Sequence, residues 1–138
     1  MKKLFYILAF LCLLTQSCKK ENNTLDLLPG RWHGSYEVEL DYVDQIGRRT
    51  KYEHDLTITY LSASKGYDAE VKPSGNWPMY SFEFRVDKNN TIIVEGDKDA
   101  SRYNGAIIKR LDEKNLVLEL ATYEHDVIVP LIMEMRRQ

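Results

Sequence analysis

The sequence predicts an all-β fold: a small, antiparallel, up-and-down barrel of about eight strands. Apolar and polar residues alternate with a period of two in successive short segments from Gly30 onward. Turn signals separate these segments at the spacing expected of an all-β sandwich or barrel. No segment keeps a helical period. Because the connections are mostly short, neighbouring strands are expected to pair, and a meander of this length avoids exposed edges most simply by closing on itself.

The first expected strand, residues 32–42 (WHGSYEVELDY), shows the alternation most cleanly. Trp32, Tyr36 and the apolar residues after them share one parity, and polar residues occupy the other, as in a strand with one buried face. Similar patterns predict seven further strands, at residues 51–60, 67–72, 80–87, 91–96, 106–111, 116–122 and 127–137. Pro130 cannot donate a ladder hydrogen bond, so the last strand is expected to contain an edge, a bulge or the barrel seam.

The N-terminus has a different character from the rest of the chain. Lys2 and Lys3 precede eleven apolar residues (LFYILAFLCLL), which suits a signal peptide but is too short for a spanning helix. The following "TQSC" resembles the bacterial lipoprotein signal, in which a peptidase cuts before a cysteine that carries a lipid. The resemblance implies a cleaved signal at 1–17, lipidated Cys18 with a polar tether at 18–28, and the barrel domain at 29–138. A plain secretory signal with an incidental cysteine is the alternative.

The cysteine count agrees with this interpretation. Of the two cysteines, Cys12 lies in the segment that would be removed, so Cys18 has no intramolecular partner for a disulfide. Its expected partner is a membrane. Lys19 follows the cysteine, and by the same resemblance this favours the outer membrane, with the periplasmic and the surface face both open.

The charge balance argues against nucleic acid as a partner. Removal of residues 1–17 leaves 17 basic and 21 acidic side chains, a formal charge of −4. No basic run or stripe stands out in the sequence, as a phosphate-binding surface would require.

A second resemblance begins at "LLPGRW", where Gly30 and Trp32 stand at the entry to the first strand. This pattern is similar to that of calycins, and particularly of small lipocalin-like domains in bacterial lipoproteins. In that family the tryptophan closes one barrel end and a basic residue of the last strand packs over it. The resemblance implies a closing pair of Trp32 with Arg136 or Arg137, and we expect Arg136. An ordinary core role for Trp32 is the alternative.

Aromatic residues on the expected apolar faces indicate what the barrel holds. An eight-stranded barrel has room for packed side chains or for one small ligand, and tyrosine suits an amphipathic guest. The expected ligand-binding residues are Tyr36, Tyr60, Tyr80, Phe82, Phe84 and Met133. The alternative is that these side chains fill the core. Trp77, in the loop "PSGNWPMY", is expected to contact a partner, to cap the barrel mouth or to anchor the loop.

The tetrapeptide "YEHD" occurs twice, at residues 52–55 and 123–126. Two such clusters could supply metal ligands or acid–base groups. In a strand, however, the two carboxylates point away from the histidine, so we expect no metal site, no cofactor and no catalytic residues. The sequence therefore predicts a lipid-anchored binding protein for a small apolar or amphipathic ligand. The alternative is a protein-interaction module with a filled barrel, such as an envelope accessory subunit or a hydrolase inhibitor.

Overall fold

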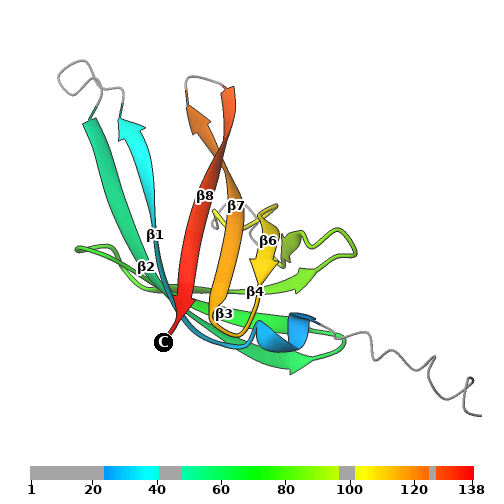
Figure 1. Cartoon of the computed structure of the whole chain (residues 1–138). Coiled ribbons are helices and arrows are strands. Elements are labelled where there is room, and N and C mark those ends of the chain that lie inside the picture. The colour runs from blue at the N-terminus through cyan, green and yellow to red at the C-terminus, as the bar shows by residue number, and fades with distance from the viewer. Residues whose placement is uncertain (1–23, 41–47, 97–101, 125–126) are drawn as a thin grey trace, which may run out of the picture.

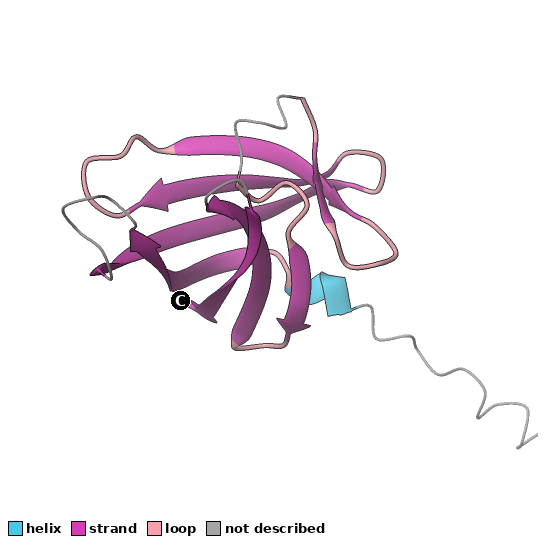
Figure 2. Ribbon diagram, turned by 90° about the horizontal axis from the view of Figure 1, so that it is seen from above, coloured by secondary structure: helices cyan, strands magenta, loops and turns pink. Residues whose placement is uncertain are grey.

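The computed structural model describes residues 24–40, 48–96, 102–124 and 127–138. It consists of a short 3₁₀ helix, η2, and eight antiparallel strands in one sheet (Figures 1 and 2). The elements are η2 (Thr24–Leu27), β1 (Gly30–Leu40), β2 (Arg48–Ser62), β3 (Gly66–Pro73), β4 (Tyr80–Val86), β5 (Ile92–Val94), β6 (Ile107–Leu111), β7 (Asn115–Glu124) and β8 (Val127–Arg137). The signal segment, Cys18 and most of the expected tether lie outside the described residues.

The strand order β5-β4-β3-β2-β1-β8-β7-β6 is that of an up-and-down meander in which the first and last strands pair. The two ends of the sheet, β5 and β6, meet at a bridge between Thr91 and Ile107. The backbone N–H of Ile92 donates to the Ala106 carbonyl at 2.7 Å, and that of Ile108 donates to the Asn90 carbonyl at 2.8 Å. The chain therefore forms a nearly closed barrel of lipocalin-like architecture, and the predicted fold class is confirmed.

The barrel has a seam where β1 meets β8. These strands pair only between Trp32–Ser35 and Glu134–Arg137, and beyond this point they diverge (Figure 1). Gly34 permits the close crossing, because a Cβ atom there would lie 2.5 Å from the Glu134 carbonyl oxygen. Pro130 lies in the part of β8 that pairs with β7 alone. Of the three expectations for Pro130, an edge, a bulge or the barrel seam, the structure therefore shows an edge beside the seam.

One end of the barrel, here called the closed end, is formed by η2, Trp32 and Arg137. Trp32 is fully buried, and its Nε1 donates to the Leu28 carbonyl at 3.0 Å. The guanidinium carbon of Arg137 lies 4.2 Å from the centre of the indole ring, a cation–π geometry. The guanidinium also donates to the backbone carbonyls of Pro29, at 2.9 Å, and of Leu27.

The expectation that Arg136 packs over Trp32 is wrong. Trp32 pairs with Arg137 in the register of β1 and β8. Because side chains alternate along a strand, Arg137 shares the inner face with the buried Met133 and Met135, whereas Arg136 is exposed on the outside.

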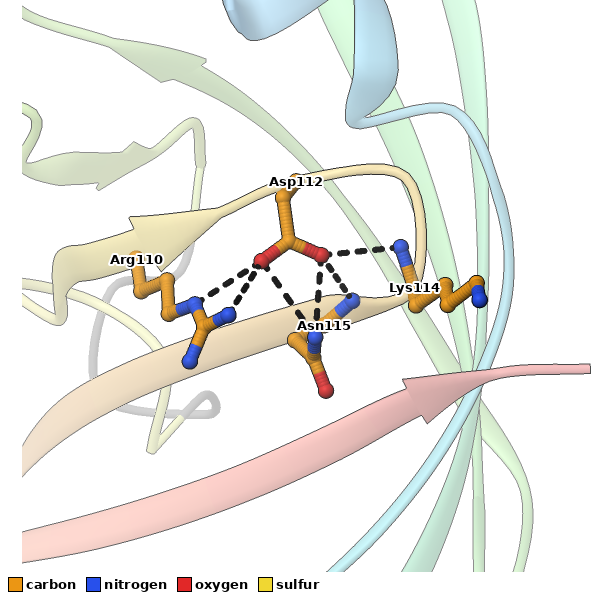
Figure 3. Close-up of polar contacts among 4 residues, drawn as sticks. All are labelled: Arg110, Asp112, Lys114 and Asn115. Atoms are coloured by element: carbon orange, nitrogen blue, oxygen red, sulfur yellow. Dashed lines mark hydrogen bonds and ion pairs between the residues drawn. The ribbon is translucent and has the colours of Figure 1, made fainter.

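The turn between β6 and β7 completes the closed end, and Figure 3 shows how Asp112 holds it. One carboxylate oxygen accepts hydrogen bonds from the backbone N–H groups of Lys114, at 2.9 Å, and Asn115, at 2.8 Å. The other accepts from Nε of Arg110 at 2.8 Å. These contacts, led by the Lys114 N–H, lower the pKa of Asp112 to about 2. The ordered turn also presents the Glu113 carbonyl to Nε of Arg137, 2.8 Å away.

Packed side chains fill the interior next to the closed end. The largest fully buried side chains are Trp32, Tyr103, Phe84, Leu28, Leu116, Leu118, Met133, Met135, Val71 and Val94. They come from β1, β3, β4, β5, β7, β8 and the two connections that precede β1 and β6. This half of the barrel is core, so any room for a ligand lies toward the other end.

Candidate ligand pocket at the open end of the barrel

A pocket of about 250 Å³ lies at the end of the barrel opposite Trp32, here called the open end. Tyr36, on its wall, lies four residues along β1 from Trp32, which corresponds to about 13 Å. The volume is slightly below the 300–1,000 Å³ range that is common for ligand sites, so it fits a small molecule of one or two rings. The pocket is lined by Tyr36, Tyr52, His54, Pro73, Trp77, Pro78, Tyr80 and Arg102.

Tyrosine rings form much of the wall. Tyr36 and Tyr52 are directly opposite each other on β1 and β2, and their rings stack with centroids 5.4 Å apart. Tyr80 adds a third ring from the first residue of β4. Burial raises the pKa of Tyr36 and that of Tyr80. Tyr36 and Tyr80 therefore keep protonated hydroxyl groups beside their apolar rings, which suits a guest that is partly apolar and partly polar.

His54 is the buried polar residue of the site. Its Nδ1 lies 2.8 Å from the Tyr103 hydroxyl, which in turn lies 3.9 Å from Sδ of Met133. The imidazole packs edge-on to the Tyr36 ring, with centroids 5.3 Å apart and planes at 86°. Burial, and then the positive charge of Arg102, lowers the pKa of His54. The ring is consequently neutral at pH 7 and serves as a hydrogen-bonding part of the wall.

Arg102 supplies the charge at the pocket. It precedes β6, and its side chain is exposed while its Nη1 donates to the Tyr36 hydroxyl at 3.1 Å. No acidic residue is among the eight described residues that line the pocket. The wall therefore carries one formal positive charge.

Trp77 stands at the rim, in the connection between β3 and β4. It lines the pocket and is nevertheless 69% exposed. Met79, two residues later, is 53% exposed. The indole thus has one side toward the pocket and most of its surface toward solvent, which agrees with two of the roles that the sequence left open, mouth cap and contact surface.

The six predicted ligand-binding residues fall in three different places in the structure. Tyr36 and Tyr80 line the pocket. Phe84 and Met133 are fully buried in the core, and Phe82 stacks on Tyr103 with centroids 5.5 Å apart. These three side chains form the packed layer beneath the pocket.

The prediction that Tyr60 faces the interior is wrong. Gly30, the first residue of β1, pairs with Ile58, so Tyr60 extends past the closed end. There it is 53% exposed and packs edge-on against Tyr67.

Five lining residues were not predicted as site residues: Tyr52, His54, Pro73, Pro78 and Arg102. Tyr52 and His54 share the inward parity of Leu56 and Ile58, so the alternation itself contained the signal. Arg102 lies in a connection without periodicity and reaches Tyr36, a residue 66 positions away, only because the barrel closes.

The first "YEHD" copy separates its polar groups, as strand geometry requires. His54 points inward, while Glu53 pairs with Lys51 at 3.1 Å and Asp55 contacts Nδ1 of His33 at 2.6 Å on the outside. Within the part of the chain that the structure describes, no three His, Cys, Asp or Glu side chains gather as metal ligands would. The second copy falls partly outside that part.

A larger hollow of about 890 Å³ runs along the outer side of the β1–β8 seam. Its wall mixes acidic residues, among them Glu37, Glu53 and Glu134, with basic residues such as Lys51 and Arg136. It has no aromatic wall comparable to that of the pocket, and its mixed charges are typical of a solvated surface.

The fold and the pocket together define a class: a small eight-stranded antiparallel barrel that is packed at one end and hollow at the other. Comparisons with protein-family models, with curated proteins and with solved structures give no match. Among the residues that the structure describes, no helix has the length and apolar character needed to cross a membrane.

Proposed function

We propose that this protein is a lipid-anchored lipoprotein of the cell envelope, of the lipocalin-like type, and that its barrel binds a small amphipathic molecule. One observation supports the binding role above all: a pocket of about 250 Å³ at the open end, walled by three tyrosines, His54 and Trp77. Aromatic walls favour a flat apolar body, and the hydroxyl and imidazole groups provide hydrogen bonds that orient it. The described polar contact of the His54 ring is with a tyrosine hydroxyl and not with a carboxylate, so we propose binding and not catalysis.

Binding can be tested with 2-naphthamide, a neutral two-ring probe. The protein has two tryptophans, and only Trp77 lies at the pocket, whereas Trp32 is buried at the closed end. We expect saturable quenching of tryptophan fluorescence, and we expect Trp77→Phe to abolish that signal. Tyr80→Ala should weaken binding because it removes part of the wall. Tyr60→Ala, the same change at an exposed position away from the pocket, should bind like the wild type. Absence of saturable binding by both fluorescence and calorimetry would contradict the proposal.

The anchor is supported by the N-terminal sequence: a signal-like segment, the junction "TQSC", and the loss of Cys12 with the signal. Acyl chains contribute about 0.8 kcal/mol for each buried CH₂ group, so multiple acylation of Cys18 would hold the protein on a membrane. Lys19 after the cysteine favours the outer membrane. Mass spectrometry of the protein from a Gram-negative host should show an acylated N-terminal cysteine, and Cys18→Ser should yield protein without lipid. An unmodified Cys18 in the mature protein would refute the anchor.

A protein-interaction module is the second candidate, and the exposure of Trp77 and Met79 favours it. Exposed aromatic residues at a rim are common centres of protein interfaces. If a protein partner, such as an envelope subunit or a secreted hydrolase, binds there, Trp77→Ala should abolish co-purification of that partner while leaving thermal stability unchanged. A large loss of stability would instead identify Trp77 as a loop anchor.

A further inference from the structure

The charge of the pocket wall points to the chemical class of its guest. Of the eight lining residues, Arg102 alone carries a formal charge at pH 7, because His54 is neutral there. Its guanidinium is fixed at the rim by the hydrogen bond from Nη1 to the Tyr36 hydroxyl at 3.1 Å. A guanidinium has five N–H donors, and this bond uses one of them.

The field of Arg102 reaches the aromatic wall. Its charge acts on Tyr36, Tyr80 and Tyr103, where it partly opposes the rise in pKa that burial causes, and on His54, where it adds to the lowering of the pKa by burial. The positive charge of Arg102 thus reaches the rings of the pocket wall. The described residues provide no ion-pair partner for Arg102 within 4 Å, whereas Arg85 and Arg110 on the outer surface pair with Glu95 and Asp112.

We propose that the guest is an organic anion: a flat, aromatic or otherwise apolar body of one or two rings that carries a carboxylate or a similar acid group. The body lies against Tyr36, Tyr52 and Tyr80, and the acid group lies at the rim beside Arg102. Planar guanidinium groups match carboxylates with two parallel hydrogen bonds, and the adjoining Tyr36 hydroxyl is a further donor. This inference rests on the proposed binding function and adds that the guest carries a negative charge.

The test uses three probes of nearly the same shape and different charge: 2-naphthoate, 2-naphthamide and naphthalene-2-carboxamidine, which is a cation. Calorimetric titration of the purified protein at pH 7 should give naphthoate the highest affinity, about tenfold above naphthamide, since one charge-assisted hydrogen bond at a partly exposed site corresponds to roughly that factor. The amidine should bind most weakly. The preference for naphthoate should shrink as salt is raised, because the charge is near solvent.

Variants of two arginines locate the effect. Arg102→Gln should remove the preference for naphthoate over naphthamide, while Arg102→Lys should keep part of that preference. Arg31→Gln is the matched control, because Arg31 is exposed on β1 beside the closed end and its replacement changes the net charge equally. Arg31→Gln should retain the full preference.

The outcomes separate the two proposals. If naphthamide and naphthoate bind equally well, or if the amidine binds best, the inference about an anion is refuted and the binding function stands. The inference is also overturned if Arg31→Gln reduces the preference as much as Arg102→Gln, because the effect would then follow the net charge. If none of the three probes binds, the proposed function itself is contradicted.

Discussion

Replacement of Arg137 by methionine should destabilise the protein far more than the same replacement of its neighbour Arg136. Arg137 donates to three backbone carbonyls, those of Leu27, Pro29 and Glu113, and its guanidinium lies over Trp32. It thus joins the segment before β1, the β6–β7 turn and the last strand. Arg136 is exposed on the outer face of the same strand. Comparison of the two variants isolates the effect of the direction in which the side chain points, because both variants lose one charge and gain one thioether.

The magnitude follows from the contacts. Hydrogen bonds from a charged donor contribute about 1.5–3 kcal/mol each, and a cation over an aromatic ring contributes about 0.5–2 kcal/mol. These contributions do not add fully, since the guanidinium is only partly buried, water can replace it at the carbonyls, and methionine retains some packing on the indole. We expect a loss of about 2–4 kcal/mol for Arg137→Met, and about 0.5 kcal/mol or less for Arg136→Met.

Thermal unfolding followed by far-ultraviolet circular dichroism measures the difference. In a domain of this size 1 kcal/mol corresponds to about 4 °C, so the unfolding midpoint should fall by about 8–16 °C for Arg137→Met and by about 2 °C for Arg136→Met. Urea titration gives the free energies directly, provided that the slopes of the two variants agree. Equal midpoints for the two variants would refute the assignment of Arg137 to the closed end, and a larger loss for Arg136→Met would reverse it.

Three further predictions concern the turn, the seam and the pocket. Asp112→Asn should lower the unfolding midpoint at pH 7, and the difference from the wild type should vanish in acid. The pKa of Asp112 is lowered from 3.8 to about 2 in the folded protein, so the contribution of the ionised carboxylate to stability is lost as the pH falls through about 2. Gly34→Ala should cost about 1–3 kcal/mol in urea unfolding, because the new Cβ meets the Glu134 carbonyl at 2.5 Å, whereas Ser35→Ala should be nearly neutral. Burial lowers the pKa of His54 in the folded protein, so the unfolded chain binds a proton at this residue more readily. The free energy of unfolding should therefore fall as the pH drops below about 6.5. In His54→Gln this part of the pH dependence should disappear.

The alternation of residues predicted the strands well, because burial of one sheet face imposes a period of two that tertiary packing does not change. Tyr36 and Phe84 lie inside the barrel for this reason. Parity does not say where along the barrel axis a residue falls, and this explains the error at Tyr60. That side chain has the inward parity of Ile58 but extends beyond the start of β1. Its position depends on the register between two strands, which the pattern of one strand does not contain.

The choice between Arg136 and Arg137 was open to the same reasoning. Met133, Met135 and Arg137 share a parity, so an inward Met133 already implies an inward Arg137. Arg102 is different, because no local pattern marks it. Its contact with Tyr36 exists only when β5 meets β6 and closes the barrel. The charged residue of the candidate site is therefore the part that the sequence could not supply, since loop residues are placed by the whole fold and not by their neighbours.

The positions of the two barrel ends connect the proposed anchor with the proposed guest. The described chain begins with η2 at the closed end, and Thr24 follows Cys18 by six residues. Six residues span at most about 20 Å, so acylation of Cys18 would hold the closed end near the membrane. The pocket lies at the opposite end, with Trp77 and Arg102 at its rim. A guest would then enter from the aqueous side and not directly from the leaflet that holds the anchor. A molecule that reaches the pocket through water must be soluble in water. An acid group on a small apolar body provides that solubility, and the same group complements the positive charge of Arg102.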